Sequence, residues 1–266
     1  MRPVPDLPAA LMQLAQDSYG AAGAAPPLLI VHGLFGSARN WGAIAKRLSN
    51  DRHVIAVDMR NHGSSPWAES HDYPAMAADL AEVVGAQGAP MDVLGHSMGG
   101  KAAMMLALAR PDLVNRLLVA DIAPVAYTHS QSHLIAAMSR LDPASFSARS
   151  DADAALAENV TDPGVRAFLL QSLDLRSTPP RWRLNLAVLD REMDKITGWP
   201  GSVQGEFNRP TLFLSGAKSD YVLPEHRPAI KALFPNAKFA KIPNAGHWLH
   251  AEEPRAFEQT ARAWFD

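Results

Sequence analysis

The sequence contains no cysteine among its 266 residues. This absence excludes disulfide bonds, thiolate metal sites and a cysteine nucleophile. A large net charge is also missing, because 27 Asp and Glu residues balance 25 Lys and Arg residues to give a net charge of −2. Strong electrostatic attraction to nucleic acid or to an anionic membrane is therefore excluded, and neither is predicted as a partner.

Long apolar runs are absent as well. No segment reaches about 18 consecutive apolar residues, so no transmembrane helix is predicted. The N-terminal stretch MRPVPDLPAALMQLAQ contains prolines and an Asp where a secretion signal would have an unbroken apolar region. We therefore expect a cytoplasmic location. The sequence does not predict the oligomeric state.

Six short apolar runs recur along the chain, with helical patterns between them. Continuous apolarity over four or five residues is typical of strands that are buried on both faces of a parallel sheet. This alternation predicts an α/β protein with a mostly parallel, doubly wound sheet. The runs are LLIV at 28–31, VIAV at 54–57, MDVL at 91–94, LLVA at 117–120, TLFL at 211–214 and KFAKI at 238–242.

One interval interrupts the alternation of strands and helices. Between residues 125 and 207 no strand is predicted, and Asp142-Pro143 and Pro179-Pro180 are among the breaks between short helical segments. We interpret residues 125–207 as a helical insert. The core then consists of residues 1–124 and 208–266.

The sharpest motif is Gly95-His96-Ser97-Met98-Gly99, which fits the pattern G-x-S-x-G. It follows a predicted strand and precedes a predicted helix, which is the context that this motif requires. A turn this tight strains the serine backbone and presents its hydroxyl above the sheet, at the positive end of a helix dipole. Ser97 is therefore the candidate nucleophile.

A serine hydroxyl needs a general base. His247 lies in the loop between the last predicted strand and the final helix, and it follows both the serine and any acid in chain order. The order Ser, Asp, His is that of one class of serine hydrolases. His250, three residues later, is the weaker candidate because it would lie in the first helical turn.

Stabilisation of an oxyanion needs two backbone N–H groups. Met98, directly after the nucleophile, is one candidate donor. The second is Leu34, in the glycine-containing loop HGLFG at 32–36 after the first predicted strand. We expect the ring of His32 to hold this loop by hydrogen bonds rather than to act as a base.

Together these motifs resemble α/β-hydrolase-fold serine esterases. The sequences HGLFGSARNW at 32–41, VDMRNHGSSP at 57–66, LGHSMGGKAAM at 94–104, VADIAP at 119–124 and NAGHWLHAEEP at 244–254 carry the resemblance. It is strongest to the subgroup of YbfF-type and abhydrolase-domain-11 esterases. The resemblance implies a core with an inserted helical lid and hydrolysis of short- to medium-chain acyl esters, with acyl-CoA thioesters as a further substrate class.

Two carboxylates compete for the role of triad acid. In most members of the fold the acid follows the strand read here as TLFLS, where Ser219 occupies the usual position and Asp220 lies one residue further. The subgroup resemblance implies a variant in which the acid follows the preceding strand, at Asp121, while a serine occupies the usual site. We expect Asp121 to be the acid and Ser219 to be a hydrogen-bond partner of His247.

Aromatic residues close to these loops are candidates for the acyl pocket. We expect Phe35, Tyr127 and Trp248 to contact substrate, whereas Trp41 lies on a predicted helix and is assigned to the core. Lys101 lies one helical turn beyond Ser97. A contact with a phosphate or CoA group is the alternative for Lys101, but we expect it to be a solvated or paired helix residue.

The sequence therefore predicts a serine hydrolase that cleaves a small acyl ester through an acyl-enzyme, without a cofactor or metal. Two alternatives stay open at this point. Cofactor-free haloperoxidases and carbon–carbon bond hydrolases use the same triad with another pocket. A ligand-binding protein can also use the fold without catalysis, because fold does not imply function.

Overall fold

The computed structural model describes residues 7, 12–201, 203 and 205–266. The N-terminal stretch interpreted as lacking a secretion signal lies mostly outside the described residues, as do residues 202 and 204 of the predicted insert. No helix in the described ranges is long and apolar enough to cross a membrane.

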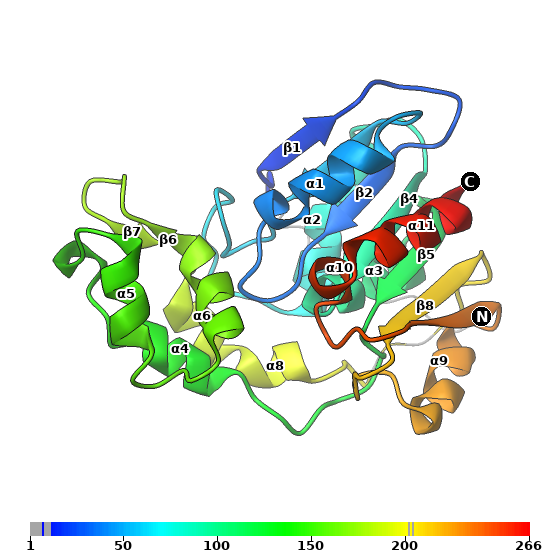
Figure 1. The fold of residues 1–266 in the computed structure, drawn as a ribbon. Coiled ribbons are helices and arrows are strands. Elements are labelled where there is room, and N and C mark those ends of the chain that lie inside the picture. The colour runs from blue at the N-terminus through cyan, green and yellow to red at the C-terminus, as the bar shows by residue number, and fades with distance from the viewer. Residues whose placement is uncertain (1–6, 8–11, 202, 204) are drawn as a thin grey trace.

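A seven-stranded sheet forms the centre of the molecule, with strand order β1-β3-β2-β4-β5-β8-β9 (Figure 1). Only β1 is antiparallel to its neighbour, and the other pairs are parallel. The strands are β1 (Gln16–Tyr19), β2 (Leu28–Val31), β3 (Val54–Val57), β4 (Met91–His96), β5 (Val114–Ala120), β8 (Thr211–Gly216) and β9 (Ala237–Ile242). All six predicted strands are present, and the polar edge strand β1 was not predicted.

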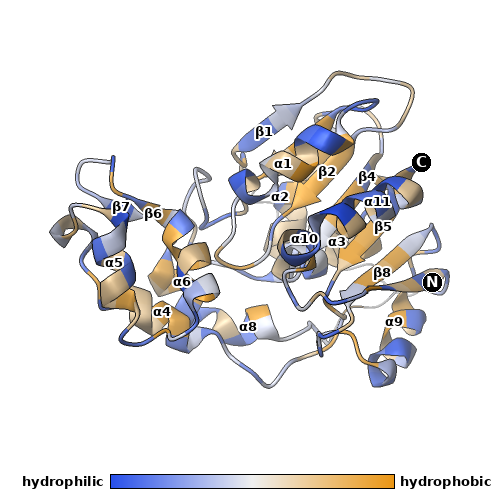
Figure 2. Ribbon diagram, in the orientation of Figure 1, coloured by the Kyte–Doolittle hydropathy of each residue, from blue (hydrophilic) through white to orange (hydrophobic). Residues whose placement is uncertain are grey.

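The central strands are buried on both sides, which explains their continuous apolar sequences. In β2, Leu28 and Ile30 pack into one hydrophobic cluster, whereas Leu29 and Val31 pack into another on the opposite face. Figure 2 shows β2 and β5 coloured as hydrophobic, next to helices α1 and α11, in which hydrophilic and hydrophobic residues are mixed. The predicted doubly wound α/β class is therefore confirmed.

Helices cover both faces of the sheet. One face is covered by α1 (Ala38–Leu48) and α11 (Pro254–Phe265). The other face is covered by α2 (Tyr73–Gly85), α3 (Met98–Ala109) and α9 (Arg227–Leu233). These helices lie between the strands or after the last one, in the intervals where helical patterns were predicted. A short helix α10 (Leu249–Glu252) and a 3-10 turn η3 (Pro224–His226) complete the core.

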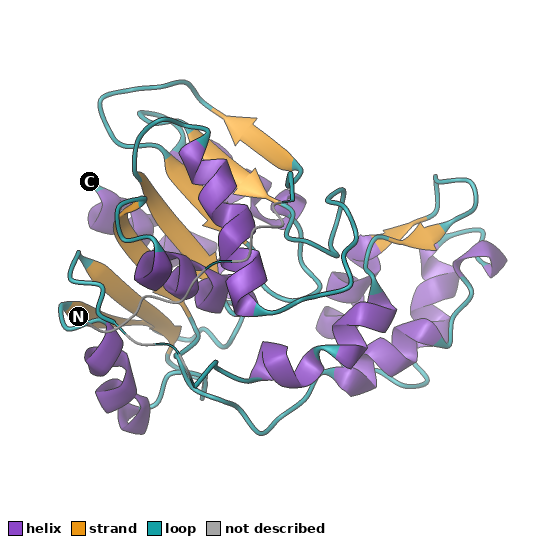
Figure 3. Cartoon of the chain, turned by 180° about the vertical axis from the view of Figure 1, so that it is seen from behind, coloured by secondary structure: helices purple, strands orange, loops and turns teal. Residues whose placement is uncertain are grey.

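The chain between β5 and β8 forms a separate group of short helices next to the core (Figures 1 and 3). They are α4 (Ser132–Ser139), α5 (Arg149–Leu156), α6 (Pro163–Leu169), α7 (Leu186–Arg191) and α8 (Met193–Thr197), with 3-10 turns η1 (Pro143–Ser145) and η2 (Leu170–Ser172). The expectation that this interval holds no strand was wrong. A small antiparallel ribbon, β6 (Leu173–Asp174) with β7 (Arg181–Trp182), lies within it.

Lys101 connects this group of helices to the core. Its side chain is buried, and its Nζ donates hydrogen bonds to the carbonyl oxygens of Thr197 and Gly198 at the end of α8, at 2.9 and 2.5 Å. The rings of Tyr73 and Tyr127 flank the ammonium group. Burial lowers the pKa of Lys101 to about 7. The expectation of a solvated or paired helix residue was therefore wrong, because backbone carbonyls replace both water and a carboxylate.

A buried ion pair holds the loop after β3 against α2. The Nε and Nη2 atoms of Arg60 donate to the two carboxylate oxygens of Asp79 at 2.7 and 2.9 Å. Both side chains are almost fully buried, with 4% and 0% of their surfaces exposed. The same carboxylate accepts the backbone N–H of Met12. Removal of either partner would leave an unpaired charge in the interior.

We therefore expect Arg60→Met or Asp79→Asn to lower the free energy of unfolding by about 3 to 5 kcal/mol. Urea denaturation measures this change. The matched control is Arg110→Met, which breaks the exposed pair with Asp112, where 46% and 61% of the side-chain surfaces are accessible. That control should cost less than about 1 kcal/mol. Equal effects for the buried and exposed pairs would contradict the expectation.

Candidate active site

Ser97 lies in a sharp turn between β4 and α3. Its backbone angles are φ 53° and ψ −123°, a conformation that non-glycine residues rarely adopt. A side chain at Gly95 would collide with the carbonyl oxygen of Gly99, and one at Gly99 would collide with that of His32. The two glycines of the motif are therefore required by close backbone packing around the strained serine.

A chain of hydrogen bonds connects Ser97, His247 and Asp121. The distance from Ser97 Oγ to His247 Nε2 is 3.0 Å, and that from His247 Nδ1 to Asp121 Oδ2 is 2.8 Å. The three residues follow β4, β9 and β5, whose carboxyl ends lie at the same edge of the sheet. With Nδ1–H donating to the carboxylate, Nε2 is free to accept the serine proton.

The carboxylate of Asp121 is fully buried and has further partners. Its Oδ1 accepts the backbone N–H of Gly216 at 3.0 Å, and its Oδ2 accepts the hydroxyl of Ser219 at 2.5 Å. The expected direct bond between Ser219 and His247 is thus replaced by a bond to the carboxylate. Asp220 is exposed, and no hydrogen bond joins it to His247 among the described residues.

Leu34 and Met98 line the same cavity as Ser97, and the backbone N–H group of neither has a hydrogen-bond partner within the part of the chain that is described. The neighbouring N–H of Phe35 instead donates to His62 Nε2 at 3.2 Å. His32 holds the same loop, because its Nδ1 donates to the carbonyl of Gly33 at 2.7 Å. This contact agrees with the structural role expected for His32.

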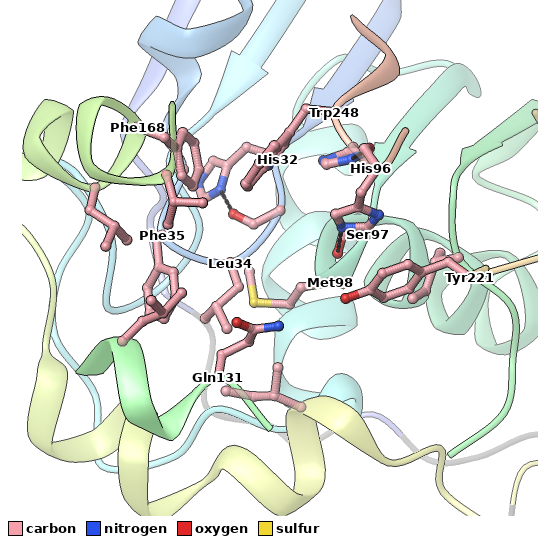
Figure 4. A pocket seen from close by; sticks show the side chains of 18 of the residues that line it. His32, Leu34, Phe35, His96, Ser97, Met98, Gln131, Phe168, Tyr221 and Trp248 are labelled. Carbon is pink, nitrogen blue, oxygen red and sulfur yellow. Dashed lines mark hydrogen bonds between the residues drawn. The ribbon is translucent and has the colours of Figure 1, made fainter. Parts of the chain in front are cut away.

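A cavity of about 500 Å³ opens at Ser97 (Figure 4). Phe35, Tyr127 and Trp248 line it, as predicted. The insert supplies Leu134, Val160, Val165, Phe168 and Leu169 to the same cavity. This volume is within the range of pockets that enclose small organic ligands, roughly 300 to 1,000 Å³.

Trp41 also borders the cavity but is fixed by core contacts. Only 1% of its surface is exposed, and its ring stacks on that of His250 at 4.2 Å between centroids. His250 lies in α10, where burial lowers its pKa to about 3. The preference for His247 over His250 therefore agrees with the geometry, since His250 has no contact with Ser97 among the described hydrogen bonds.

Sequence reasoning missed two side chains at the site. Tyr221 lies in the loop after β8, and its ring stacks on the imidazole of His247. His96 Nε2 donates to the carbonyl oxygen of His247 at 2.9 Å, which fixes the loop that carries His247. The position of His96 inside the G-x-S-x-G motif could have identified it as a residue of the site. No motif distinguishes Tyr221 in the sequence. Across the described ranges, no cluster of three or more His, Asp or Glu side chains could hold a metal ion.

A family model for the alpha/beta hydrolase fold matches residues 26–254. Together with the strand order and the serine turn, this match shows that the chain belongs to the α/β-hydrolase family. Because the relatives described next are esterases and lipases, the chain is a hydrolase of that family, and the predicted resemblance is confirmed.

The chain is 44% identical over 243 residues to the sn-1-specific diacylglycerol lipase ABHD11 of Mus musculus, covering 87% of this chain and 78% of that protein. It is 39% identical over 257 residues to esterase YbfF of Escherichia coli strain K12, covering 96% and 97% of the two chains. A solved structure of a marine microorganism esterase superposes with a TM-score of 0.90 at 37% sequence identity. The match covers 95% of this chain and 99% of the esterase chain.

Burial of the histidines near the site predicts how stability depends on pH. Burial lowers the pKa of His32 to about 4 and, with the neighbouring His32, that of His62 to about 3. The unfolded chain, with histidine pKa values near 6.5, therefore binds more protons below that pH than the folded protein does. The contribution of these two histidines to the free energy of unfolding is therefore complete above about pH 6.5 and is lost as the pH falls toward 4.

We expect the free energy of unfolding to fall by about 2 kcal/mol for each of these two histidines between pH 6.5 and pH 4.5. Urea denaturation at a series of pH values measures the loss. His62→Gln should remove one of the two contributions, whereas His53→Gln, at a partly exposed position, should leave the dependence as it is. A wild-type stability that is constant over this range would contradict the expectation.

Proposed function

We propose that the chain is a serine carboxylic ester hydrolase that works through an acyl-enzyme, with Ser97 as nucleophile, His247 as general base and Asp121 as the acid of the triad. The hydrogen-bond chain from Ser97 Oγ through the imidazole to the buried carboxylate carries this proposal. The relatives named esterase and lipase support an ester as the substrate.

In the proposed reaction, Ser97 Oγ attacks the ester carbonyl carbon while His247 Nε2 takes the hydroxyl proton. The carbonyl oxygen becomes an oxyanion. It accepts hydrogen bonds from the N–H group of Leu34, in the loop after β2, and from that of Met98, at the start of α3. His247 then gives its proton to the leaving alcohol as the ester C–O bond breaks. A water molecule, deprotonated by His247, attacks the acyl-enzyme and releases the acid and free Ser97.

Asp121 supports this cycle from a fixed position. Its carboxylate holds Nδ1–H of His247 and so maintains the tautomer in which Nε2 accepts a proton. The bonds from Gly216 N–H and the Ser219 hydroxyl hold the carboxylate in a fixed orientation, aimed at the imidazole. In this proposal Ser219 acts through Asp121 rather than through His247.

We propose that residues 125–207 form a lid over the core of residues 1–124 and 208–266, and that the covered cavity favours short- to medium-chain acyl groups. Lys101 is the only Lys or Arg among the described lining residues, and its ammonium group is held by two carbonyl oxygens. Uncharged esters therefore suit the pocket better than acyl-CoA thioesters. Phe35, Tyr127 and Trp248 are the proposed contacts of the acyl chain.

A p-nitrophenyl ester series from C2 to C16 tests this function. We expect the highest kcat/KM at short to medium chain lengths and a lower value for the acyl-CoA of the same chain length. Ser97→Ala should reduce turnover by about 10⁶ and abolish fluorophosphonate labelling while the fold is retained. Residual turnover above a few per cent in the pure variant, or a maximum at C16 with interfacial activation, would oppose the proposal.

The assignment of the acid has its own test. Asp121→Asn should lower kcat by about 10⁴, because the correct tautomer and the stabilisation of the imidazolium are both lost. Asp220→Asn, at an exposed neighbouring position, is the matched control and should cost tenfold or less. Ser219→Ala removes one hydrogen bond to a charged group, about 1.5 to 3 kcal/mol, so it should be intermediate. A large loss of kcat in Asp220→Asn together with a small loss in Asp121→Asn would reverse the assignment.

A further inference from the structure

The ring of Tyr221 lies flat against the imidazole of His247. The ring centroids are 3.9 Å apart and the ring planes differ by 20°. Tyr221 lies between β8 and η3, and its side chain points toward the serine turn (Figure 4). It therefore covers one face of the proposed base, while Ser97 and Asp121 bind the two nitrogens at the ring edge.

Several contacts fix Tyr221 in this position. Its backbone N–H donates to Ser219 Oγ at 3.3 Å, and its carbonyl oxygen accepts the hydroxyl of Tyr127 at 2.6 Å. The rings of Tyr127 and His129 pack against its side chain at 5.2 and 4.9 Å. Ser219 thus binds both the triad carboxylate and the backbone that carries the stacked ring.

The groups around His247 determine which interactions its charged form would have. Asp121 is the carboxylate in direct contact. Glu252 of α10 lies close by, where it accepts the N–H groups of Gly246 and Trp248 on either side of the histidine. In the loop after β8, Asp220 is exposed and makes no hydrogen bond with the ring among the described residues, although its charge lies near enough to Tyr221 to add to burial in raising the pKa of the phenol.

The neighbouring histidines do not add positive charge. Burial lowers the pKa of His96 well below its usual value and that of His250 to about 3, so both are neutral at pH 7. Burial, followed by the charge of Asp220, raises the pKa of Tyr221 to about 12, so the phenol is also neutral. The imidazole of His247 therefore stacks on the π face of a neutral phenol ring.

We propose that Tyr221 is a positioning residue that locks the ring plane of His247 and stabilises its protonated form through a cation–π contact. The proposal rests on the proposed function, in which the imidazolium forms during both acylation and deacylation. An aromatic face attracts a cation more strongly than a neutral ring, so the contact favours the charged state. The stacked ring also prevents rotation that would remove Nε2 from Ser97.

Three variants test this role. Tyr221→Leu keeps apolar volume over the imidazole but removes the π face, Tyr221→Phe restores the π face without the hydroxyl, and Tyr19→Leu is a control on the distant edge strand β1. The readouts are the pH profile of kcat with p-nitrophenyl acetate and a ¹³C NMR titration of the His247 imidazole. The imidazole signal is assigned by comparison with His247→Gln.

We expect Tyr221→Leu to lower kcat by about 2- to 30-fold and to move the midpoint of the acidic limb to lower pH by about 0.4 to 1.5 units. The NMR midpoint should move in the same direction, Tyr221→Phe should recover most of both changes, and Tyr19→Leu should show neither. A merely structural role would lower kcat in Tyr221→Leu without moving either midpoint, and that result would overturn the proposal.

The NMR arm separates this proposal from the proposed function. If the wild-type protein hydrolyses esters and the NMR midpoint is the same in Tyr221→Leu, the role of Tyr221 fails while the function holds. If no ester is hydrolysed but the NMR midpoint falls in Tyr221→Leu and recovers in Tyr221→Phe, the contact holds while the function fails. A midpoint that rises in Tyr221→Leu would show that the ring excludes water rather than stabilises the cation.

Discussion

The carboxylate of Asp121 is the point at which the fold and the site depend on each other. It is fully buried, and it accepts hydrogen bonds from the backbone of Gly216, the hydroxyl of Ser219 and the ring of His247. Gly216 is the last residue of β8, Ser219 and His247 lie in the loops after β8 and β9, and Asp121 itself follows β5. A buried anion without such partners would be strongly unfavourable, so the loops that satisfy it must pack in this arrangement.

Hydrogen bonding within the sheet places this carboxylate. The backbone N–H of Asp121 donates to the carbonyl of Leu214, and that of Ser97 donates to Ala120. Each strand end is thus held by the end of its neighbour. Because parallel strands finish at the same edge, residues separated by more than 120 positions in the chain reach hydrogen-bonding distance. The cavity lies at this edge, and residues from the helices between β5 and β8 line its other side.

The sequence predicted the parts of this arrangement that depend on local pattern. Continuous apolar runs identified the six parallel strands, since burial on both faces leaves no alternation. Gly95 and Gly99 identified the serine turn because no larger residue fits there. In contrast, β1 has the polar sequence QDSY at an exposed edge and therefore lacks an apolar run. The strands β6 and β7 have two residues each, which is too short for a periodic pattern.

Contacts that depend on tertiary packing were beyond local pattern. Lys101 reads as a surface cation in the sequence, and only the position of α8 supplies the carbonyl oxygens that hold it in the interior. Ser219 was expected to bond to His247, whereas its hydroxyl donates to Asp121, because spacing along the chain does not distinguish a carboxylate oxygen from a ring nitrogen 2.8 Å away. Tyr221 stacks on His247 through a loop conformation that no motif encodes.

Backbone strain is concentrated at the same edge of the sheet. The non-glycine residues with positive φ among those described are Phe35, Asn61, Ser97, Asp121 and Asn244. They follow β2, β3, β4, β5 and β9 in turn, at the carboxyl ends of five parallel strands. Each such conformation costs about 1 to 3 kcal/mol and persists only where surrounding contacts enforce it. Part of the stability of the sheet is therefore offset by sharp turns at these five strand ends, and the turns after β2, β4, β5 and β9 bring residues 32–36, Ser97, Asp121 and His247 together at one edge of the sheet, beside the cavity.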